Sequence, residues 1–536
     1  MCLCPVCGTH AAAERGQQCG AFPPRPSQVH HSCRDLKNLE AQISTTKTFL
    51  AHLESHLLVL RSEYNRAHDH FTHRLPPEII SRVFGFCASR EGELSPFDLG
   101  AVCKRWREIA WSTPQLWTSL DVDLNWLEIN SQTRSWLIQE WLSRSGELPL
   151  SISVTYVKTD MAPLPLAILE NILDVLNRFS RRWRDLDLSI PFALLPALCG
   201  DGDGVSILNT LRISPPEILD DAEEELVHRL AYPFQITNAS PSLQRVAITS
   251  FPFSMVGINW QNVTDVSFDD IPIYDFHSLL REARNLIKCI VDIKDDGSRF
   301  SAPPSIERPC LIDLDIGLHQ TFQTSPSLIF DPISLPRLKK VTYRPGYQPF
   351  AAFAAFIERS RCSLEALILD EVHEGEGMDI ILMNEDALWN LLWNLRTLTT
   401  LVFNIPVVAK KFFDLLYIPY SPTTNPDQPI FLPQITSIRH DCDEVMFSWD
   451  RVIRSATSRL KLRGEDGQPI LRLLEFQVHE LERLDELLVA RICHTVASGV
   501  EIRIKRGLED VLETHRREYE QARFGTIDGS WEEDLL

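Results

Sequence analysis

The sequence predicts an α/β protein in which an N-terminal heptad helix and a compact helical unit precede an irregular solenoid of strand–helix repeats. Three observations predict this order. Apolar residues recur at steps of three and four between positions 36 and 67, residues 75–120 contain helix-start and helix-stop signals, and an i, i+3, i+5 apolar spacing recurs beyond residue 145. Because 536 residues exceed what one hydrophobic core holds, we expect several domains.

The bulk composition excludes several classes of function. Hydrophobic residues make up 44% and charged residues 24% of the chain, as in globular proteins. The net charge of −20 would repel nucleic acid. No stretch reaches the roughly 18 apolar residues of a membrane helix, and the N-terminus lacks the pattern of a secretory signal. Thirteen cysteines at low density fit a reducing compartment, so we expect a cytoplasmic or nuclear location.

Residues 1–34 are rich in Cys, Pro, Gly and His and show no periodicity. Cys4 and Cys7 form a CxxC pair, and Cys19 and Cys33 lie downstream. A structural zinc site needs four ligands at tetrahedral distance, and a single CxxC pair without a second pair at finger or ribbon spacing is a weak signal. The pattern therefore favours a disordered tail, and zinc binding by these cysteines stays open.

The segment 35–72 is predicted to form a heptad helix without internal proline or glycine. Its a/d seam covers roughly five heptads and consists of Leu36, Leu39, Ile43, Thr46, Leu50, Leu53, Leu57, Leu60, Tyr64 and Ala67. Two interpretations stay open: a coiled coil that makes the protein a homodimer through residues 36–67, or a single helix that packs this stripe on its own chain. The coiled-coil interpretation is weakened by Thr46 in the seam and by the small number of complementary charges beside the seam.

Residues 73–120 carry the strongest local pattern. Pro76 and Pro77 open a first helix, because proline is tolerated in a first turn, and Glu78 suits the positive end of the helix dipole. The apolar residues on one face are Ile79, Ile80, Val83 and Phe84. Gly85 and the polar loop after it are expected to end this helix.

A second helix is predicted to begin at Ser95, with Pro96 at its first position and Asp98 completing a capping box. Its wide apolar stripe consists of Leu99, Val102, Cys103, Trp106, Ile109 and Ala110. Thr113 and Pro114 stop it. A unit of about 45 residues has more apolar face than it can bury alone, so the next domain or a separate partner must cover part of it.

The order LPxEII…VF, a loop, and L..VCKRWRxIA…P.LW resembles the F-box, particularly the F-box-like form common in fungal proteins. The resemblance implies a three-helix motif that docks on a Skp-type adaptor, which bridges to a cullin scaffold. By resemblance, the adaptor-binding residues are Leu75, Pro76, Ile79, Ile80, Val83 and Phe84, with Leu99, Val102, Cys103 and Trp106 shared between that interface and internal packing. The longer inter-helix loop, residues 88–94, leaves the register of the second helix open.

Residues 145–505 are predicted to form an irregular repeat domain. Ten or eleven apolar triplets run from Trp183 to Phe476, each marking a short strand whose alternate residues point inward. The intervening segments 280–287, 353–359 and 385–395 look helical. Strand plus helix, repeated, resembles the leucine-rich-repeat plan, in which each unit buries its apolar edge on the next.

The repeats depart from that family because its usual Asn, eight residues after the first leucine, is missing and repeat lengths vary. This predicts an irregular horseshoe, and a non-repetitive α/β domain is the alternative. The segment 480–497 reads as a helix and 500–504 as a strand. Residues 506–536 read as a C-terminal helix, from about residue 508, and an acidic tail, and these elements would cap the last repeat.

Strand residues between the apolar positions would line one surface that carries both signs of charge. Such a face suits a protein ligand better than a small molecule. The residues assigned to target binding are Asp265, Asp269, Asp313, Asp315 and Arg344.

The sequence offers no enzyme signature. It contains no dinucleotide-binding glycine motif, P-loop, HExxH or GxSxG, and the DGDG at 201–204 lacks the later ligands of a calcium loop. No catalytic, cofactor or metal site is therefore predicted. We expect a non-enzymatic substrate-recognition subunit of a cullin-based (SCF-type) ubiquitin ligase with an unidentified protein target. The alternative is a coiled-coil structural or scaffolding protein without a ligase role.

Overall fold

The computed structural model describes residues 26–68, 74–88, 94–124, 131–156, 166–200, 206–216, 234–236, 242–295, 305–319, 324–346, 350–370, 385–403, 408–418, 429–444, 447–464, 467–481, 484–507 and 509–525. The predictions for most of the N-terminal tail, the DGDG segment and the acidic C-terminal tail lie outside these residues. The chain divides into two compact units. One comprises residues 1–117 with 144–146, and the other comprises 118–143 with 147–536.

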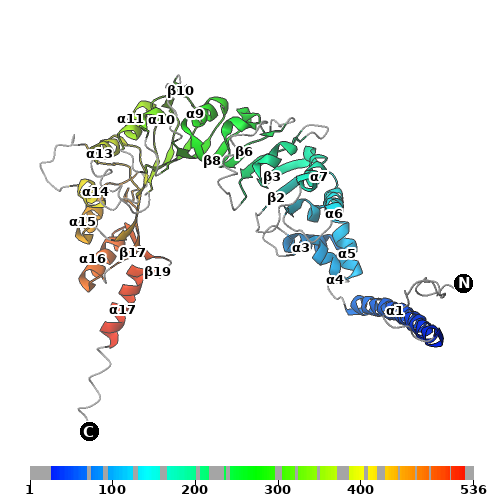
Figure 1. Ribbon diagram of the computed structural model, residues 1–536. Coiled ribbons are helices and arrows are strands. Elements are labelled where there is room, and N and C mark those ends of the chain that lie inside the picture. The colour runs from blue at the N-terminus through cyan, green and yellow to red at the C-terminus, as the bar shows by residue number, and fades with distance from the viewer. Residues whose placement is uncertain are drawn as a thin grey trace, which may run out of the picture. The chain divides into compact units, whose positions relative to one another are not determined.

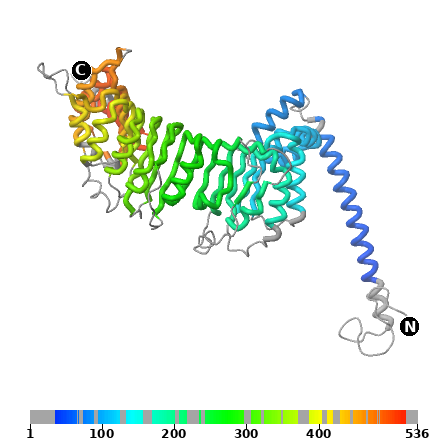
Figure 2. The backbone as a smooth tube through the Cα atoms, turned by 90° about the horizontal axis from the view of Figure 1, so that it is seen from above, coloured from blue at the N-terminus to red at the C-terminus, as the bar shows by residue number. Residues whose placement is uncertain are grey.

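The first unit begins with α1 (Pro26–His68), an uninterrupted helix of 43 residues, drawn in blue in Figure 2. At 1.5 Å per residue it is roughly 65 Å long. The apolar seam that the heptad pattern predicts lies on α1, and its side chains are exposed to solvent. Within the described residues, the seam therefore does not pack on its own chain.

Four short helices follow: α3 (Pro77–Cys87), α4 (Pro96–Val102), α5 (Lys104–Trp111) and the 3₁₀ helix η1 (Pro114–Trp117). The predicted capping box is confirmed, since the Ser95 side chain accepts from the Asp98 amide and the Asp98 carboxylate accepts from the Ser95 amide. The prediction that Gly85 ends the first helix is wrong. One glycine inside a helix costs only about 1 kcal/mol, so packing of the flanking residues outweighs it.

The second predicted helix is two helices, because Cys103 adopts an extended backbone (φ −159°, ψ 170°) between α4 and α5. The Cys103 thiol caps α5 by accepting from the Trp106 amide at 3.4 Å. The chain changes direction at Cys103, so the apolar residues on either side of it do not form one continuous helical stripe.

The second unit is organised around one long sheet with 15 strands among the described residues, in the order in which they occur in the chain. Neighbouring strands run parallel, except that β19 is antiparallel to β18. The strands are β1 (Ser119–Asp123), β2 (Leu150–Thr155), β3 (Trp183–Ser189), β4 (Thr210–Ser214), β6 (Arg245–Thr249), β8 (Asp265–Pro272), β9 (Lys288–Lys294), β11 (Asp313–Leu318), β13 (Lys340–Arg344), β14 (Ala366–Leu369), β15 (Thr400–Phe403), β16 (Ser437–Glu444), β17 (Leu473–Glu480), β18 (Glu501–Arg506) and β19 (Glu509–Asp510).

Helices follow most of the strands and lie along one side of the sheet (Figure 1). They are α6 (Ser131–Arg144), α7 (Leu166–Asn177), α9 (Ile273–Glu282), α10 (Ser327–Phe330), α11 (Ala351–Ser360), α13 (Glu385–Asn394), α14 (Val408–Leu416), α15 (Trp449–Arg459), α16 (Glu486–Ala497) and α17 (Val511–Gly525). The remaining short elements are η2 (Ser180–Arg182), η3 (Phe192–Ala197), η4 (Phe253–Met255), η5 (Trp260–Asn262), and the paired strands β5 (Phe234–Gln235) with β7 (Val256–Gly257) and β10 (Ile306–Glu307) with β12 (Ile333–Ser334).

The strand register places the apolar triplets in two buried rows. Leu314 of β11, for example, stands opposite Cys289 of β9 and Val341 of β13, and Ile316 stands opposite Val291 and Tyr343. Because side chains alternate across a strand, both rows face the helices. The resulting core is continuous from β1 to the start of α17. The mixed helix and strand content confirms the α/β class.

Three predictions about element boundaries in the second unit are wrong, and so is the disorder expected for residues 26–34, which form the start of α1. The sheet begins at Ser119 rather than beyond residue 145. The helix expected over 280–287 is α9, which ends at Glu282, because Leu286 already contributes to the buried row that leads into β9. The helix expected from residue 480 begins at Glu486, because β17 continues through Glu480.

Within the described residues, no helix combines the length and apolarity that crossing a bilayer requires.

Candidate functional site: two protein-interaction surfaces

The core of the helical unit is built from the inner faces of α3, α4 and α5. The Phe84 ring packs on Trp106 with the ring centroids 4.8 Å apart, and the hydroxyls of Ser81 and Thr113 lie 2.8 Å apart. Ile80 and Phe84 are therefore buried within this unit itself. This corrects the assignment of Ile80 and Phe84 to the adaptor-binding residues.

The outer face of α3 carries a different apolar stripe. Pro76 caps the helix and is exposed, Ile79 is 42% exposed, and Phe86 is 77% exposed. Val83, between them, is half-buried, as is Leu75 ahead of the helix. The steps of three, four and three from Pro76 to Phe86 place these residues on one side of the helix. Sequence reasoning missed Phe86, although its spacing of seven residues from Ile79 was the signal for it.

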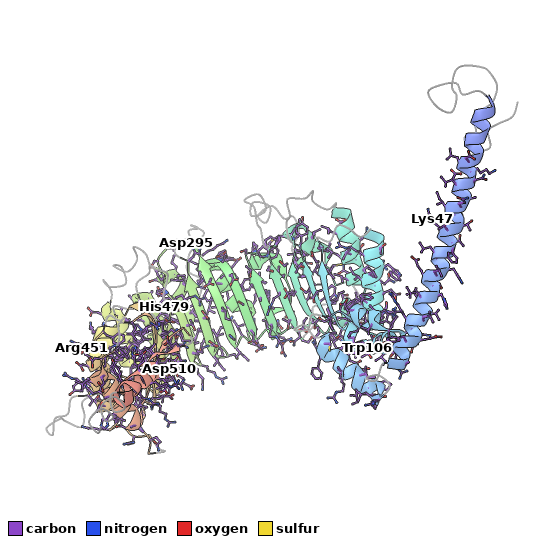
Figure 3. The ribbon with its side chains drawn as sticks, turned by 90° about the horizontal axis from the view of Figure 1, so that it is seen from below. Lys47, Trp106, Asp295, Arg451, His479 and Asp510 are labelled. Carbon is purple, nitrogen blue, oxygen red and sulfur yellow. The ribbon has the colours of Figure 1, made fainter. Side chains whose placement is uncertain are left out.

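On α4 and α5 the predicted residues divide between core and surface. Leu99 is buried, Cys103 and Trp106 (labelled in Figure 3) are half-buried, and Val102 is exposed. Two apolar side chains that the sequence reasoning did not select, Leu94 and Phe97, are exposed as well. Together with Ile79, Phe86 and Val102 they form what we call the exposed apolar set of the helical unit.

Close packing fixes α4 on α5. A Cβ atom on Gly100 would lie 2.0 Å from the Trp111 ring, so the two helices approach as closely as a glycine permits. The Arg107 guanidinium donates to the Gly100 carbonyl at 2.9 Å. Trp111 and Trp117 meet edge to face with centroids 5.2 Å apart, and the Arg144 guanidinium lies 5.1 Å from the Trp111 ring. The helical unit therefore presents its exposed apolar set from a rigid frame.

The second surface is the face of the sheet opposite to the helices, which we call the open face; it is seen in Figure 3. One row across it alternates in charge, and its members are Arg245, Asp265, Lys288, Asp313 and Lys340 on β6, β8, β9, β11 and β13. The Lys340 ammonium lies 3.4 Å from the Asp313 carboxylate. The strand register therefore places opposite charges side by side along this part of the face.

Arg344, at the end of β13 on the same face, links β13 to β11 and β9. Its guanidinium donates to the carboxylates of Asp315 at 2.6 Å and Asp292 at 2.7 Å. Gly317 leaves the space for this contact, since a Cβ there would lie 2.1 Å from the Asp292 carboxylate. Burial raises the pKa of Asp315, while Arg344 opposes that shift.

The structure brings together three of the five residues assigned to target binding: Asp313, Asp315 and Arg344. Asp265 and Asp269 lie on β8, two strands from β11, where they accept hydrogen bonds from the hydroxyls of Thr264 and Thr249. Sequence reasoning missed Asp292, because its contact with Arg344 spans the strand between them and depends on the register of all three.

A further charge cluster lies near the C-terminal end of the open face. The Glu475 carboxylate is contacted by Arg439 at 3.4 Å, Arg503 at 3.6 Å and Lys505 at 3.6 Å. The Glu475 side chain is buried beneath these cations. Both charge clusters are internally compensated, so the open face offers patterned charge rather than a field of one sign.

Buried titratable groups in this unit have structural roles. His440 is buried, stacks on the Phe403 ring at 4.5 Å, and its Nδ1 lies 2.8 Å from the Phe403 carbonyl. Burial lowers its pKa to about 4, so the ring is neutral near pH 7. Among the residues that the structure describes, no group of three or more His, Cys, Asp or Glu side chains is arranged to hold a metal ion.

Comparison with known proteins gives one positive result. A family model described as F-box-like matches residues 72–123, which contain α3, α4, α5 and β1. No curated protein matches the chain. The exposed apolar set therefore lies entirely within the matched segment.

Proposed function

We propose that this protein is a substrate-recognition subunit of a cullin-based (SCF-type) ubiquitin ligase, because it contains an F-box-like domain at residues 72–123. F-box domains generally bind Skp-type adaptors. The observation that carries the proposal is the coincidence of that domain with apolar side chains that are exposed in the isolated chain. In this role the protein itself catalyses nothing, and ubiquitin transfer belongs to other subunits.

The proposed adaptor surface is centred on the outer stripe of α3. Ile79 and Phe86 are its principal contacts, because fully burying such a side chain contributes about 1.5–3 kcal/mol. Leu75, Pro76 and Val83 flank them, and Val102 extends the surface onto α4. Ile80, Phe84 and Leu99 support the surface from the core. A few large apolar side chains on a rigid frame are typical of the energetic centres of protein interfaces.

The proposed target surface is the open face of the long sheet. We interpret this unit as an irregular leucine-rich-repeat-type solenoid, because its strands follow chain order and its triplets share two buried rows. Such repeat stacks leave extended surfaces for protein ligands. Paired charges of both signs favour a target with complementary charge and fixed register over a small molecule. A cytoplasmic or nuclear location fits this role.

The test is affinity purification of the full chain from cells, with mass spectrometry of the proteins that are retained. We expect a Skp-type adaptor and a cullin with the native chain, and their loss with Ile79→Asp/Phe86→Asp. Leu487→Asp is the control, since Leu487 is an apolar residue on α16 that is nearly as exposed as Phe86 and lies outside the F-box-like domain.

The melting temperature of each variant shows whether it has folded. Retention of the adaptor by a folded Ile79→Asp/Phe86→Asp variant would place the interface elsewhere. Absence of adaptor and cullin from the native sample would contradict the ligase role itself and would favour a scaffolding protein.

A further inference from the structure

The helix α1 exposes an apolar seam along most of its length. The large apolar a and d side chains from Leu36 to Tyr64 are 46% to 63% exposed. Thr46 also fits this seam, because its hydroxyl donates to the Gln42 carbonyl at 2.8 Å and so leaves its methyl group available for packing. Exposure of such an apolar seam to water is unfavourable, and packing it against a second helix with the same spacing lowers the free energy.

We propose that α1 pairs with α1 of a second copy of this chain as an antiparallel two-stranded coiled coil. The inference is independent of the adaptor role. In the heptad assignment, the a positions are Leu36, Ile43, Leu50, Leu57 and Tyr64, and the d positions are Leu39, Thr46, Leu53, Leu60 and Ala67. An antiparallel pair places a against d, so Leu50 meets Leu53 of the second copy and Leu36 meets Ala67.

The charges beside the seam select this direction. The e positions are Glu40, Lys47, Glu54 and Arg61, and in antiparallel pairs e positions face e positions. Glu40 then meets Arg61 of the second copy and Lys47 meets Glu54, and the two-fold axis repeats both contacts. All four contacts join opposite charges, and charges flanking the seam set partner choice and orientation.

A parallel pair would set e positions against g positions instead. Glu40 would then face Asp35 of the second copy, and Arg61 would face His56, while Lys47 would face the uncharged Gln42. Complementary charges beside the seam are therefore few only if the two helices are parallel. Antiparallel g positions bring Phe49 against His56 and Gln42 against Glu63, without like charges.

The antiparallel direction of the two helices determines where the two F-box-like domains are attached. The F-box-like domain begins at residue 72, four residues after α1 ends. An antiparallel seam over residues 36–67 spans roughly 47 Å at 1.5 Å per residue, and it places the C-terminal ends of the two α1 helices at opposite ends of the coiled coil. The two F-box-like domains would therefore be attached far apart instead of side by side.

The test measures the monomer–dimer equilibrium of the full chain by sedimentation equilibrium. We expect a dimer that Leu50→Asp/Leu53→Asp dissociates. The diagnostic variant is Glu40→Lys, which faces Arg61 in the antiparallel pair and should weaken dimerisation roughly tenfold, whereas in a parallel pair it faces Asp35 and should strengthen it. Figure 3 labels Lys47, one of the e-position residues, on α1.

Rescue separates charge pairing from loss of helix. The double variant Glu40→Lys/Arg61→Glu restores opposite charges and should recover the native dissociation constant. Ser55→Lys, at an f position on the outer side, is the matched control and should leave it unchanged. Tighter dimerisation by Glu40→Lys, a trimer that also uses the exposed Leu58 and Val59, or a monomer at all accessible concentrations would each overturn the proposal.

Discussion

The aromatic ring of Phe84 packs against that of Trp106, with the two centroids 4.8 Å apart, whereas Phe86, two residues later on α3, is 77% exposed. Phe84 and Phe86 therefore have opposite roles within one turn of helix. Phe84 holds α3 on α5, whereas Phe86 lies on the solvent-exposed side of α3.

The first prediction separates these roles. Phe84→Ala should lower the free energy of unfolding of the helical unit by about 3–5 kcal/mol, because it leaves a cavity beside Trp106. Phe86→Ala should change stability by less than about 1 kcal/mol and should instead weaken adaptor binding. Chemical denaturation and adaptor binding of both variants check this. Equal destabilisation by the two would contradict the assignment of faces.

The second prediction concerns the contact between α4 and α5. Gly100→Ala should destabilise the helical unit by at least about 1–3 kcal/mol, because its Cβ would overlap the Trp111 ring. The matched control is Gly85→Ala on α3, where a Cβ meets nothing within 4 Å. It should stabilise the helix by about 0.5–1 kcal/mol. Thermal unfolding distinguishes them, and a neutral Gly100→Ala would show that α4 and α5 are not so closely packed.

The third prediction concerns acid stability. His440 has a folded-state pKa of about 4, below its ordinary value of 6.5, because burial disfavours the charged ring. The unfolded chain therefore binds a proton more readily, so stability is fully present above pH 6.5 and declines as the pH falls to about 4. The loss at the lower limit should be on the order of 3 kcal/mol. In His440→Phe this part of the pH dependence should disappear from denaturant unfolding curves measured between these pH values, and an unchanged slope would contradict it.

The fourth prediction concerns the open face. Asp313→Asn/Asp315→Asn keeps the side-chain shapes but removes the charges that Lys340 and Arg344 contact. It should reduce capture of the protein target at least tenfold and leave adaptor binding unchanged, because charge pairing sets specificity at such surfaces. Co-purification of targets measures this.

The control for that experiment is Asp414→Asn/Asp450→Asn, which removes two ion-paired carboxylates on α14 and α15, on the helix side of the sheet. It should leave target capture intact. Undiminished capture by a folded Asp313→Asn/Asp315→Asn variant would move the target site to another surface.

The strands could be predicted because each apolar triplet reports a local pattern with a period of two. The second and third residues of every triplet, from Leu186 and Leu188 to Leu474 and Phe476, lie in strands of the long sheet. The strand β1 was missed although Trp117, Leu120 and Val122 have the same spacing, because Trp117 also completes the helical unit. Trp117 lies outside the core of the long sheet, so its spacing from Leu120 and Val122 does not identify it as the start of a strand unit.

The inner and outer faces of α3 could not be separated from sequence. Ile79 and Ile80 are adjacent, and a stripe broad enough to hold both gives no indication of which side meets α5. The break at Cys103 decides it, because α5 turns there and brings Trp106 onto Phe84. The contact of Arg344 with Asp292 likewise depends on the register of three strands, which sequence spacing does not supply.

The most direct measurement is the titration of a purified Skp-type adaptor into the purified full chain by isothermal calorimetry. The account predicts one adaptor per chain, a strong loss of affinity with Phe86→Asp, and native affinity with Leu487→Asp. A folded native chain that releases no heat and forms no complex with the adaptor would contradict the proposed function.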